Sequence, residues 1–349
     1  MADNNTQPAT SKKLVNSVLS AIEREREREI ISRRSGLFER KETLEQIGEL
    51  LGITRERVRQ LEKSVMQKLK AAGKDNTLPG LDNFATQVLS ILTSNGCVTR
   101  VSDLASKLTE GSDRNEQSRI AFLCDLCPDL IVINDDDHYF LSVASEKVYS
   151  EKSLKQTAST IVEAVTKLGA PKSIAAIAKQ AEINDTVKAE ALARVSKHLA
   201  TLNGQWGLIK WPLVNPKNIR DKIYVILKEN GHHMHFNEIS EAIKLSDFKR
   251  KNVTTQAIHN ELIKDKRFVL IGRGIYALKE WGYEKGTVAD IIREVLREAN
   301  QPLHRDEIVK RVLKSRFVKE TTILLNLQGK PQFKRVAKAT YDLADTLES

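Results

Sequence analysis

The chain has 349 residues, of which 40% are hydrophobic, 29% charged and 5% aromatic. These proportions are typical of an ordinary globular protein, and so few aromatics favour small helical modules over one large sheet core. The length indicates more than one domain. Three cysteines exclude a disulfide framework, and no apolar run is long enough to span a membrane. Without a signal peptide, we expect a cytoplasmic protein of the nucleoid with no membrane partner.

The net charge of +10 indicates a polyanionic partner. This charge is unevenly distributed along the chain. Residues 80–150 hold 5 Lys and Arg against 11 Asp and Glu, whereas residues 216–349 hold 26 against 18. The acidic segment is therefore a poor candidate for contact with phosphate, and the segments around it are better candidates.

The first residues, 1–13, are mostly polar and predict a disordered tail. A helical pattern of apolar residues then runs from Leu14 through Val18 and Ile22 to Ile31. Within it, residues 23–29 alternate Glu and Arg, a pattern typical of a solvated helix face with ion pairs four residues apart.

Residues 43–70 predict two helices joined by a tight turn. Gly52 lies in the turn and, as a glycine, tolerates a left-handed backbone. Thr54 is a good N-cap for the second helix. The periodicity places Leu44, Ile47, Leu50 and Leu51 on the inner face of the first helix, and Val58, Leu61, Val65 and Leu69 on that of the second.

The second of these helices leaves polar side chains on its outer face: Arg55, Glu56, Arg59, Gln60 and Lys63. Arg can contact guanine O6 and N7, Gln can pair with adenine, and Glu can accept from cytosine N4. The first two turns of such a helix meet base edges in a helix-turn-helix. The pattern predicts a DNA-reading helix, with a solvated two-helix hairpin as the alternative.

The stretches Thr43-Leu-x-x-Ile-Gly48 and Gly52-Ile-Thr-Arg-Glu-Arg-Val-Arg-Gln-Leu-Glu62 resemble region 4 of the sigma-70 family. The resemblance covers a module of residues 14–73 and implies recognition of a promoter −35-like element in double-stranded DNA. It implies that Arg55, Glu56 and Gln60 touch base edges, and that Arg57 and Arg59 lie near phosphates.

Nothing in the chain resembles the aromatic-rich region 2 of sigma factors. We therefore expect a region 4 module fused to other modules rather than a complete sigma factor. Because region 4 also docks on the core enzyme, the resemblance makes RNA polymerase core a further candidate partner.

Two segments, 81–147 and 155–213, predict winged-helix modules, in which helices are followed by a two-stranded hairpin. Residues 73–80, from Gly73 to Gly80, predict a linker before the first of these modules. We interpret this first module, the acidic segment 81–147, as a protein-binding or spacer element. The predicted helices span 84–92, 101–108, 119–126, 159–168, 173–180 and 187–202, and the predicted strands span 130–133, 139–141 and 207–211.

The segments 216–281 and 284–345 are an internal duplication. Leu227, His235, Glu238 and Ile239 recur 69 positions later as Leu296, His304, Glu307 and Ile308. Phe268 and Tyr276 recur with the same spacing of eight as Phe333 and Tyr341. Each copy therefore predicts three helices followed by a hairpin.

Within the first copy, His235-Phe-Asn-Glu-Ile239 and Gly272-Arg-Gly-Ile-Tyr-Ala-Leu278 resemble the HARE-type helix-turn-helix. This winged-helix family includes the N-terminal domain of the RNA polymerase delta subunit and domains fused to restriction proteins. The second copy has Val336-Ala-Lys-Ala339 in place of the Gly-Arg-Gly turn. The resemblance implies contact with DNA or with polymerase.

Several cations of the duplicated region are candidate DNA contacts. Lys249, Arg250 and Lys251 would bind phosphate, with a solvated face as the alternative. Arg273 lies between two glycines of the predicted hairpin tip and would reach a minor groove. His235 and His304, each before a helix, are interpreted as caps or packing residues rather than metal ligands.

The sequence contains no phosphate-binding glycine loop, dinucleotide-binding glycine pattern or nucleophile elbow. We interpret Cys124 and Cys127 as small buried residues rather than metal ligands, and predict no enzyme activity, cofactor, metal or small-molecule substrate. The predicted fold is mainly α with small β wings, built as tandem helix-turn-helix and winged-helix modules.

The predicted function is a transcription regulator or polymerase-associated factor. The alternatives are a DNA-binding accessory of a restriction or defence system, and a polymerase-binding protein without sequence reading.

Overall fold

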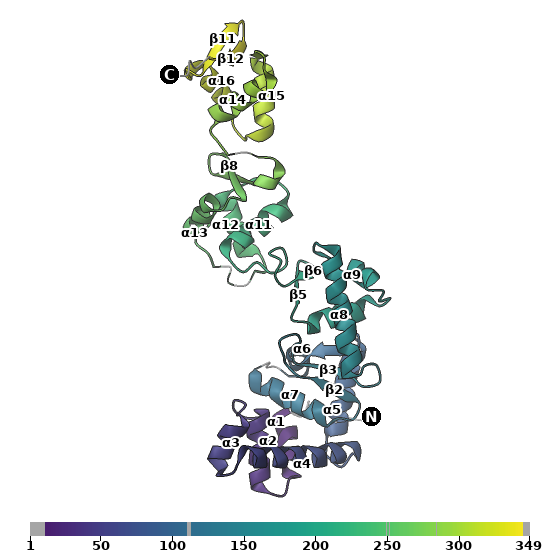
Figure 1. Ribbon diagram of the computed structural model, residues 1–349. Coiled ribbons are helices and arrows are strands. Elements are labelled where there is room, and N and C mark those ends of the chain that lie inside the picture. Colours follow the sequence, from purple (N-terminus) through teal and green to yellow (C-terminus); the bar gives the residue numbers. More distant parts are fainter. Residues whose placement is uncertain (1–10, 110–112, 249, 251, 284, 345–349) are drawn as a thin grey trace, which may run out of the picture. The chain divides into compact units, whose positions relative to one another are not determined.

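The computed structural model describes residues 11–109, 113–248, 250, 252–283 and 285–344. The chain forms two compact units that divide between Lys210 and Trp211, here called unit 1 and unit 2. Figure 1 shows that helices dominate both units and that the strands form small antiparallel sheets. This confirms the predicted fold class. No helix in the described part of the chain has the length and apolar character needed to cross a bilayer.

Unit 1 begins with four helices, α1 (Ser11–Ser20), α2 (Glu25–Ser35), α3 (Leu44–Leu51) and α4 (Arg55–Lys74), which form the helix-turn-helix segment. The predicted tail of residues 1–13 is wrong for residues 11–13. These residues are helical because α1 buries one face from Ser11 to Leu19. Residues 1–10 lie outside the described part.

The turn between α3 and α4 has the predicted backbone. Gly52 is left-handed with φ 62°, and the side chain of Thr54 accepts from the backbone N–H of Arg57 at 3.2 Å. A Cβ added at Gly48 would lie 2.7 Å from the carbonyl oxygen of Ile53, so the two helices approach closely here. Leu50 was predicted on the inner face but is 55% exposed, because α3 directs Ile47 rather than Leu50 at α4.

The rest of the described chain repeats one order of elements four times: helix, short strand, helix, helix, strand, strand. Repeats 1 and 2 belong to unit 1. Repeat 1 (81–145) comprises α5 (Leu81–Thr93), β1 (Val98–Arg100), α6 (Val101–Leu108), α7 (Arg114–Leu126), β2 (Leu130–Ile133) and β3 (Ser142–Ser145). Repeat 2 (151–208) comprises α8 (Glu151–Leu168), β4 (Lys172–Ser173), α9 (Ile174–Gln180), α10 (Thr186–Val195), β5 (Leu199–Leu202) and β6 (Gln205–Leu208).

Repeats 3 and 4 belong to unit 2 and are the two copies of the sequence duplication. Repeat 3 (219–278) comprises α11 (Ile219–Asn230), β7 (Met234–His235), α12 (Phe236–Leu245), α13 (Thr255–Lys264), β8 (Phe268–Gly272) and β9 (Ile275–Leu278). A short 3-10 helix (Lys279–Trp281) follows it. Repeat 4 (288–343) comprises α14 (Val288–Ala299), β10 (Leu303–His304), α15 (Arg305–Ser315), α16 (Glu320–Gly329), β11 (Phe333–Ala337) and β12 (Thr340–Leu343).

All four sheets have the same strand order. The last strand of each repeat lies between the other two, as β1-β3-β2, β4-β6-β5, β7-β9-β8 and β10-β12-β11, and every pairing is antiparallel. The last two strands form the hairpin that is called the wing in a winged helix. The duplication found in the sequence is therefore half of a fourfold structural repetition.

Three predicted elements of unit 1 have wrong bounds, and one contact between repeats 1 and 2 explains two of these errors. Residues 139–141 were expected to be a strand of repeat 1, but that strand is β3, and Phe140 N–H instead donates to the Val195 carbonyl of repeat 2 at 2.9 Å. The helix predicted over 187–202 stops at Val195, where Tyr139 and Ser196 form a bridge. The predicted strand 207–211 is β6, which starts and ends earlier.

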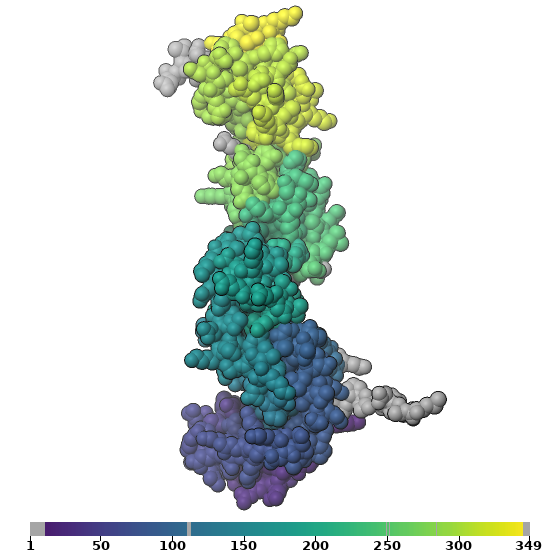
Figure 2. All heavy atoms as spheres, turned by 90° about the vertical axis from the view of Figure 1, so that its right-hand side faces the viewer, coloured from purple at the N-terminus to yellow at the C-terminus, as the bar shows by residue number. Residues whose placement is uncertain are grey.

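The helix-turn-helix segment and repeat 1 share one hydrophobic core. Apolar residues of α1, including Val15 and Val18, pack in the same cluster as Leu69 of α4 and Leu123 of α7. The stretch 73–80 is therefore not a free linker, since Leu78 is buried in this cluster. Figure 2 shows the purple and blue residues of these segments as one continuous mass.

A glycine marks the tightest point of this shared core. A Cβ added at Gly73, near the end of α4, would lie 2.2 Å from the carbonyl oxygen of Leu126 at the end of α7. Gly73→Ala should therefore destabilise the α4–α7 contact by about 1–3 kcal/mol, the usual range for overpacking. Hydrogen exchange measured on α4 and α7 peptides of the full chain should show lost protection.

Gly329→Ala is the matched control, because a Cβ at Gly329 of α16 meets no atom within 4 Å. It should leave the exchange of α4 and α7 unchanged. Equal exchange in the Gly73→Ala variant and the wild type would show that the two helices are not packed as described.

Candidate nucleic-acid interface

The candidate reading face is the exposed side of the first two turns of α4. Arg55, Glu56, Arg59, Gln60 and Lys63 are all exposed, while Val58 and Val65 on the opposite side are buried. Val58 packs with Ile30 of α2 and Ile47 of α3 in a small core that holds this end of the helix. The exposed face predicted from the sequence is thus present, and its role in binding DNA stays a prediction.

Ion pairs hold two of the arginines of this face. Arg59 donates to both carboxylate oxygens of Glu56, from Nε at 2.8 Å and from Nη2 at 2.7 Å. This hydrogen bonding lowers the pKa of Glu56 and raises the pKa of Arg59. Arg55 pairs with Glu45 of α3 at 3.0 Å. Because these groups are exposed, the pairs are weak and can be exchanged for contacts to DNA.

Arg57 lies on a different side of α4 from Arg59. It lines a groove of about 510 Å³ between α4 and the turn before α2, together with Gln60, Lys68, Glu23 and Glu27. Its guanidinium donates to the Gln60 side chain at 3.4 Å. Gln60 therefore lies at the boundary between the reading face and this groove, and Arg57 lies beyond it.

Repeat 1 fixes the position of this reading face in unit 1. Arg119 of α7 donates to the carbonyl oxygen of Leu37 at 2.8 Å, and Asn115 donates to that of Phe38 at 3.0 Å. Lys70 of α4 pairs with Asp125 of α7 at 2.8 Å. The third helix of this repeat is therefore used for an intramolecular contact, which the acidic composition of the segment did not reveal.

The predicted phosphate-binding cluster of unit 2 is described only in part. Lys249 and Lys251 lie outside the described residues. Arg250 is exposed, and its carbonyl oxygen accepts from Lys222 Nζ at 2.7 Å. Lys222 is buried, and burial lowers its pKa. A buried ammonium group thus anchors the basic loop that precedes α13.

The predicted wing contact, Arg273, is exposed at the turn between β8 and β9. Gly274 after it is left-handed with φ 71°, and a Cβ there would lie 2.5 Å from Nε2 of His235. His235 caps α12, since its Nδ1 accepts from the N–H of Asn237 at 3.3 Å, and His304 caps α15 in the same way at 3.4 Å. The capping interpretation of both histidines is confirmed.

One exposed cation was missed by the sequence analysis. Lys338 lies at the turn between β11 and β12, in the position that Arg273 has between β8 and β9. Ala339 is left-handed with φ 56°, like Gly274 in repeat 3. Repeat 4 has alanines where glycines flank Arg273 in repeat 3, so the sequence analysis did not recognise that Lys338 corresponds to Arg273. The spacing could have revealed it, since each cation stands five residues after a matched Phe.

The CxxC cysteines of α7 are core residues. Cys124 and Cys127 are buried in the shared core. Burial raises the pKa of both thiols, for Cys127 to about 12. Thiolates are the form that binds metals and attacks disulfides, so these two groups are poorly suited to either chemistry. Within the described ranges, no three His, Cys, Asp or Glu side chains gather as a metal site would require.

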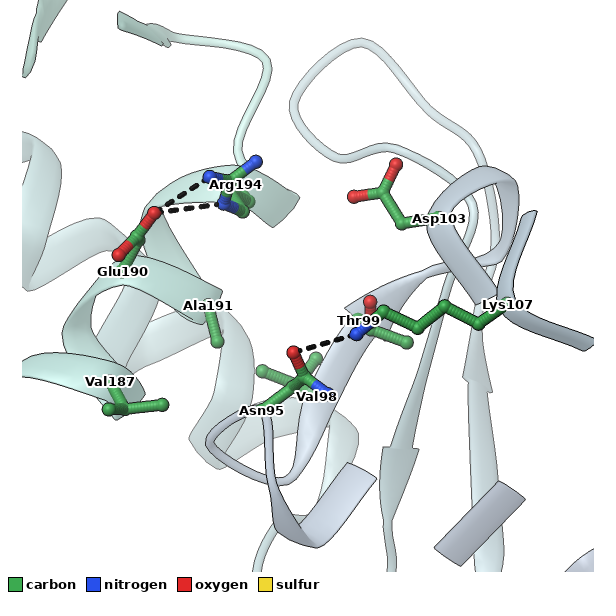
Figure 3. Close-up of a pocket in the computed structure, with 9 residues that line it drawn as sticks. All are labelled: Asn95, Val98, Thr99, Asp103, Lys107, Val187, Glu190, Ala191 and Arg194. Atoms are coloured by element: carbon green, nitrogen blue, oxygen red, sulfur yellow. Dashed lines mark hydrogen bonds and ion pairs between the residues drawn. The ribbon is translucent and has the colours of Figure 1, made fainter. Parts of the chain in front are cut away.

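A hollow of about 390 Å³ lies between repeats 1 and 2 in unit 1. Figure 3 shows the residues that line it. The hollow contains two acidic and two basic side chains, and they are engaged locally: Lys107 donates to Asn95 at 2.9 Å, and Arg194 pairs with Glu190 at 2.7 Å. Asp103 faces the same space. Because the charges balance, the hollow offers no attraction to a polyanion and is not the candidate interface.

Comparison with known proteins assigns the helix-turn-helix segment. Residues 24–71 match the family Sigma-70, region 4. Over 54 residues the chain is 46% identical to the RNA polymerase sigma factor sigB of Arabidopsis thaliana, a stretch that covers 15% of this chain and 9% of that protein. The chain thus spans less than a tenth of this relative. The resemblance to region 4 is confirmed for the segment that carries the reading face.

The thiols provide a test of the shared core. Because Cys124 and Cys127 are buried and their pKa is raised, alkylation at pH 8 should modify the half-buried Cys97 first and spare the other two until the protein is unfolded. Mass spectrometry of peptides after timed alkylation measures this order. Early modification of Cys124 would contradict the packing of α7 against the helix-turn-helix segment.

Proposed function

We propose that this protein is a sequence-specific DNA-binding factor of transcription, which reads a promoter −35-like element through α4. The observation that carries the proposal is the match to sigma-70 region 4 over residues 24–71. It coincides with a helix-turn-helix whose second helix exposes Arg55, Glu56 and Gln60 in its first two turns. Side chains of these types at this place in a helix-turn-helix read base edges in the major groove.

The roles follow the chemistry of each side chain. Arg55 offers a guanidinium for guanine, Gln60 an amide for adenine, and Glu56 a carboxylate for the N4 amino group of cytosine. Arg57, Arg59 and Lys63 supply contacts to phosphates on either side. The ion pairs of Arg55 and Arg59 with carboxylates keep these guanidinium groups in place before DNA arrives.

The rest of the chain supports this function in two ways. Repeat 1 holds α4 through the shared core, so little conformational entropy is lost when the helix enters the groove. The basic segment 216–349 would add attraction to the phosphate backbone through Arg250 and Arg273, and Lys249 and Lys251 flank Arg250 in the sequence. Repeats 3 and 4 would act as HARE-type winged helices.

Binding to RNA polymerase core is a second candidate function. It is favoured by the large exposed side chain of Leu50 on α3, which lies outside the core of the helix-turn-helix segment. Region 4 of sigma factors also docks on the core enzyme, and Leu50 beside α4 would be available for such a contact. In this case the region 4 segment would serve as a protein-docking module.

The test is selection of bound sequences from a pool of random DNA duplexes by the full-length chain at a fixed salt concentration. We expect enrichment of a −35-like hexamer. Arg55→Ala and Gln60→Ala should each weaken binding to that hexamer by about 1–3 kcal/mol and relax the preference at one or two base pairs. Arg114→Ala, which removes an exposed arginine of repeat 1, is the control and should leave the preference intact.

Two results would count against sequence reading. Equal loss of affinity for all duplexes after Arg55→Ala would show that this residue contacts only phosphates. If the wild type enriches no motif, the helix serves another partner, and capture of purified polymerase core by the wild type but not by a Leu50→Asp variant would support the second candidate function.

A further inference from the structure

The wings of repeats 3 and 4 have the same construction. In both hairpins the pairing starts from a Phe–Leu pair, Phe268 with Leu278 and Phe333 with Leu343. Both contain a register shift at the same place, between Leu270 and Gly272 and between Arg335 and Ala337. Positions in the two wings can therefore be compared one by one.

Repeat 4 contacts the backbone of the repeat 3 wing. The carbonyl oxygen of Leu270 accepts from Arg316 Nη1 at 2.7 Å, and that of Ile271 accepts from the N–H of Phe317 at 3.0 Å. A Cβ added at Gly272 would lie 2.5 Å from the Phe317 carbonyl oxygen. Ile271 is only 2% exposed and packs in an apolar cluster with Val269 and Ala277, whereas Leu270 is 51% exposed. This wing serves as an intramolecular docking surface.

The wing of repeat 4 is open. Val336, which corresponds to Ile271, is 45% exposed, and after the buried Phe333 the other four residues of β11 are all exposed. In Figure 2 the yellow β11–β12 hairpin forms a ridge that projects from its repeat. Figure 1 shows this hairpin in yellow, with its strands labelled β11 and β12.

Three of the positions compared carry a cation in the wing of repeat 4. Val269 and Leu270 of repeat 3 correspond to Lys334 and Arg335 of repeat 4, and Arg273 corresponds to Lys338. Asp342 lies opposite Lys334 in the register, so that pair is close to neutral. Arg335 and Lys338 remain as two exposed cations of one strand and turn. The wing of repeat 3 thus carries one cation, Arg273, whereas the wing of repeat 4 carries three.

The third helix of repeat 4 lacks this charge. Within α16 the sequence Glu320-Thr-Thr-Ile-Leu-Leu-Asn-Leu-Gln-Gly329 contains no Lys or Arg. The helix that reads DNA in many winged-helix proteins is thus unsuited here to approach phosphates. The cations that repeat 4 presents on its wing are therefore the better match to a polyanion.

We propose that the β11–β12 wing is a second DNA-binding site, in which Arg335 and Lys338 contact the phosphate backbone of duplex DNA without reading sequence. A two-stranded ribbon that carries a guanidinium and an ammonium group can follow a duplex backbone. The proposed function supplies only the partner, duplex DNA. The site itself is separate from α4 and does not depend on recognition of a −35-like element.

The test measures binding of the full-length chain to a duplex of random sequence at several salt concentrations. Each phosphate contact contributes about 0.9 to the slope of log K against log salt. The double variant Arg335→Ser/Lys338→Ser should therefore lower the slope by roughly 2. Between 50 and 200 mM salt, the wild type should lose about tenfold more affinity than this variant.

The matched control is Lys310→Ser/Lys314→Ser, which removes two exposed cations from α15 of the same repeat. It should leave the slope nearly unchanged. An equal fall in both variants would show that total charge matters rather than the wing, and an unchanged slope in the wing variant would equally overturn the proposal. A slope that falls on duplex RNA but not on duplex DNA would also overturn it.

This result can be separated from the test of α4. If Arg55→Ala leaves sequence preference intact while the wing variant lowers the salt slope, sequence reading by Arg55 fails and the wing site stands. If the preference for a hexamer depends on Arg55 and the wing variant behaves as the wild type, the reverse holds.

Discussion

The contact between the end of α4 and the end of α7 determines what unit 1 can do. The close approach of Gly73 to the Leu126 carbonyl brings the helix-turn-helix segment and repeat 1 into one core. A DNA-reading helix on a free linker would lose orientational freedom on binding, and that loss opposes affinity. Here the orientation of α4 within unit 1 is fixed by packing, so this orientational freedom is lost on folding and not on binding.

One order of elements is used for different purposes along the chain. In repeats 1 and 2 the third helix faces a neighbouring module: α7 lies against the helix-turn-helix segment, and α10 comes so close to repeat 1 that a Cβ at Gly96 would lie 2.7 Å from Lys188 Cα. In repeat 3 the third helix exposes Gln256 and Asn260, and the wing instead contacts the neighbouring repeat. Repeats of identical topology therefore need not share a function, because function depends on which surface of each repeat stays exposed to solvent.

The features that depend on local sequence were predictable. The left-handed Gly52, the Thr54 cap and the exposed face of α4 follow from short-range backbone and periodicity rules. The errors occur where a distant segment competes for the backbone: residues 139–141 bind repeat 2 instead of extending a strand, and the helix from Val187 ends at Val195 for the same contact. Such long-range pairings leave no periodic pattern in either segment, so sequence reasoning could not find them.

The distribution of charge in unit 1 favours selectivity over affinity. The guanidinium groups of Arg55 and Arg59 are paired with carboxylates, and the core of the reading segment is shared with an acidic repeat. Both features reduce the attraction of unit 1 to arbitrary phosphates, since non-specific affinity follows the number of uncompensated cations. A base edge that offers Arg55 a directed acceptor can replace the carboxylate of Glu45, whereas the diffuse charge of the DNA backbone competes with that carboxylate less well. In the proposed function, reading by α4 and attraction by the basic unit 2 are therefore complementary, because α4 would supply selectivity and unit 2 would supply affinity.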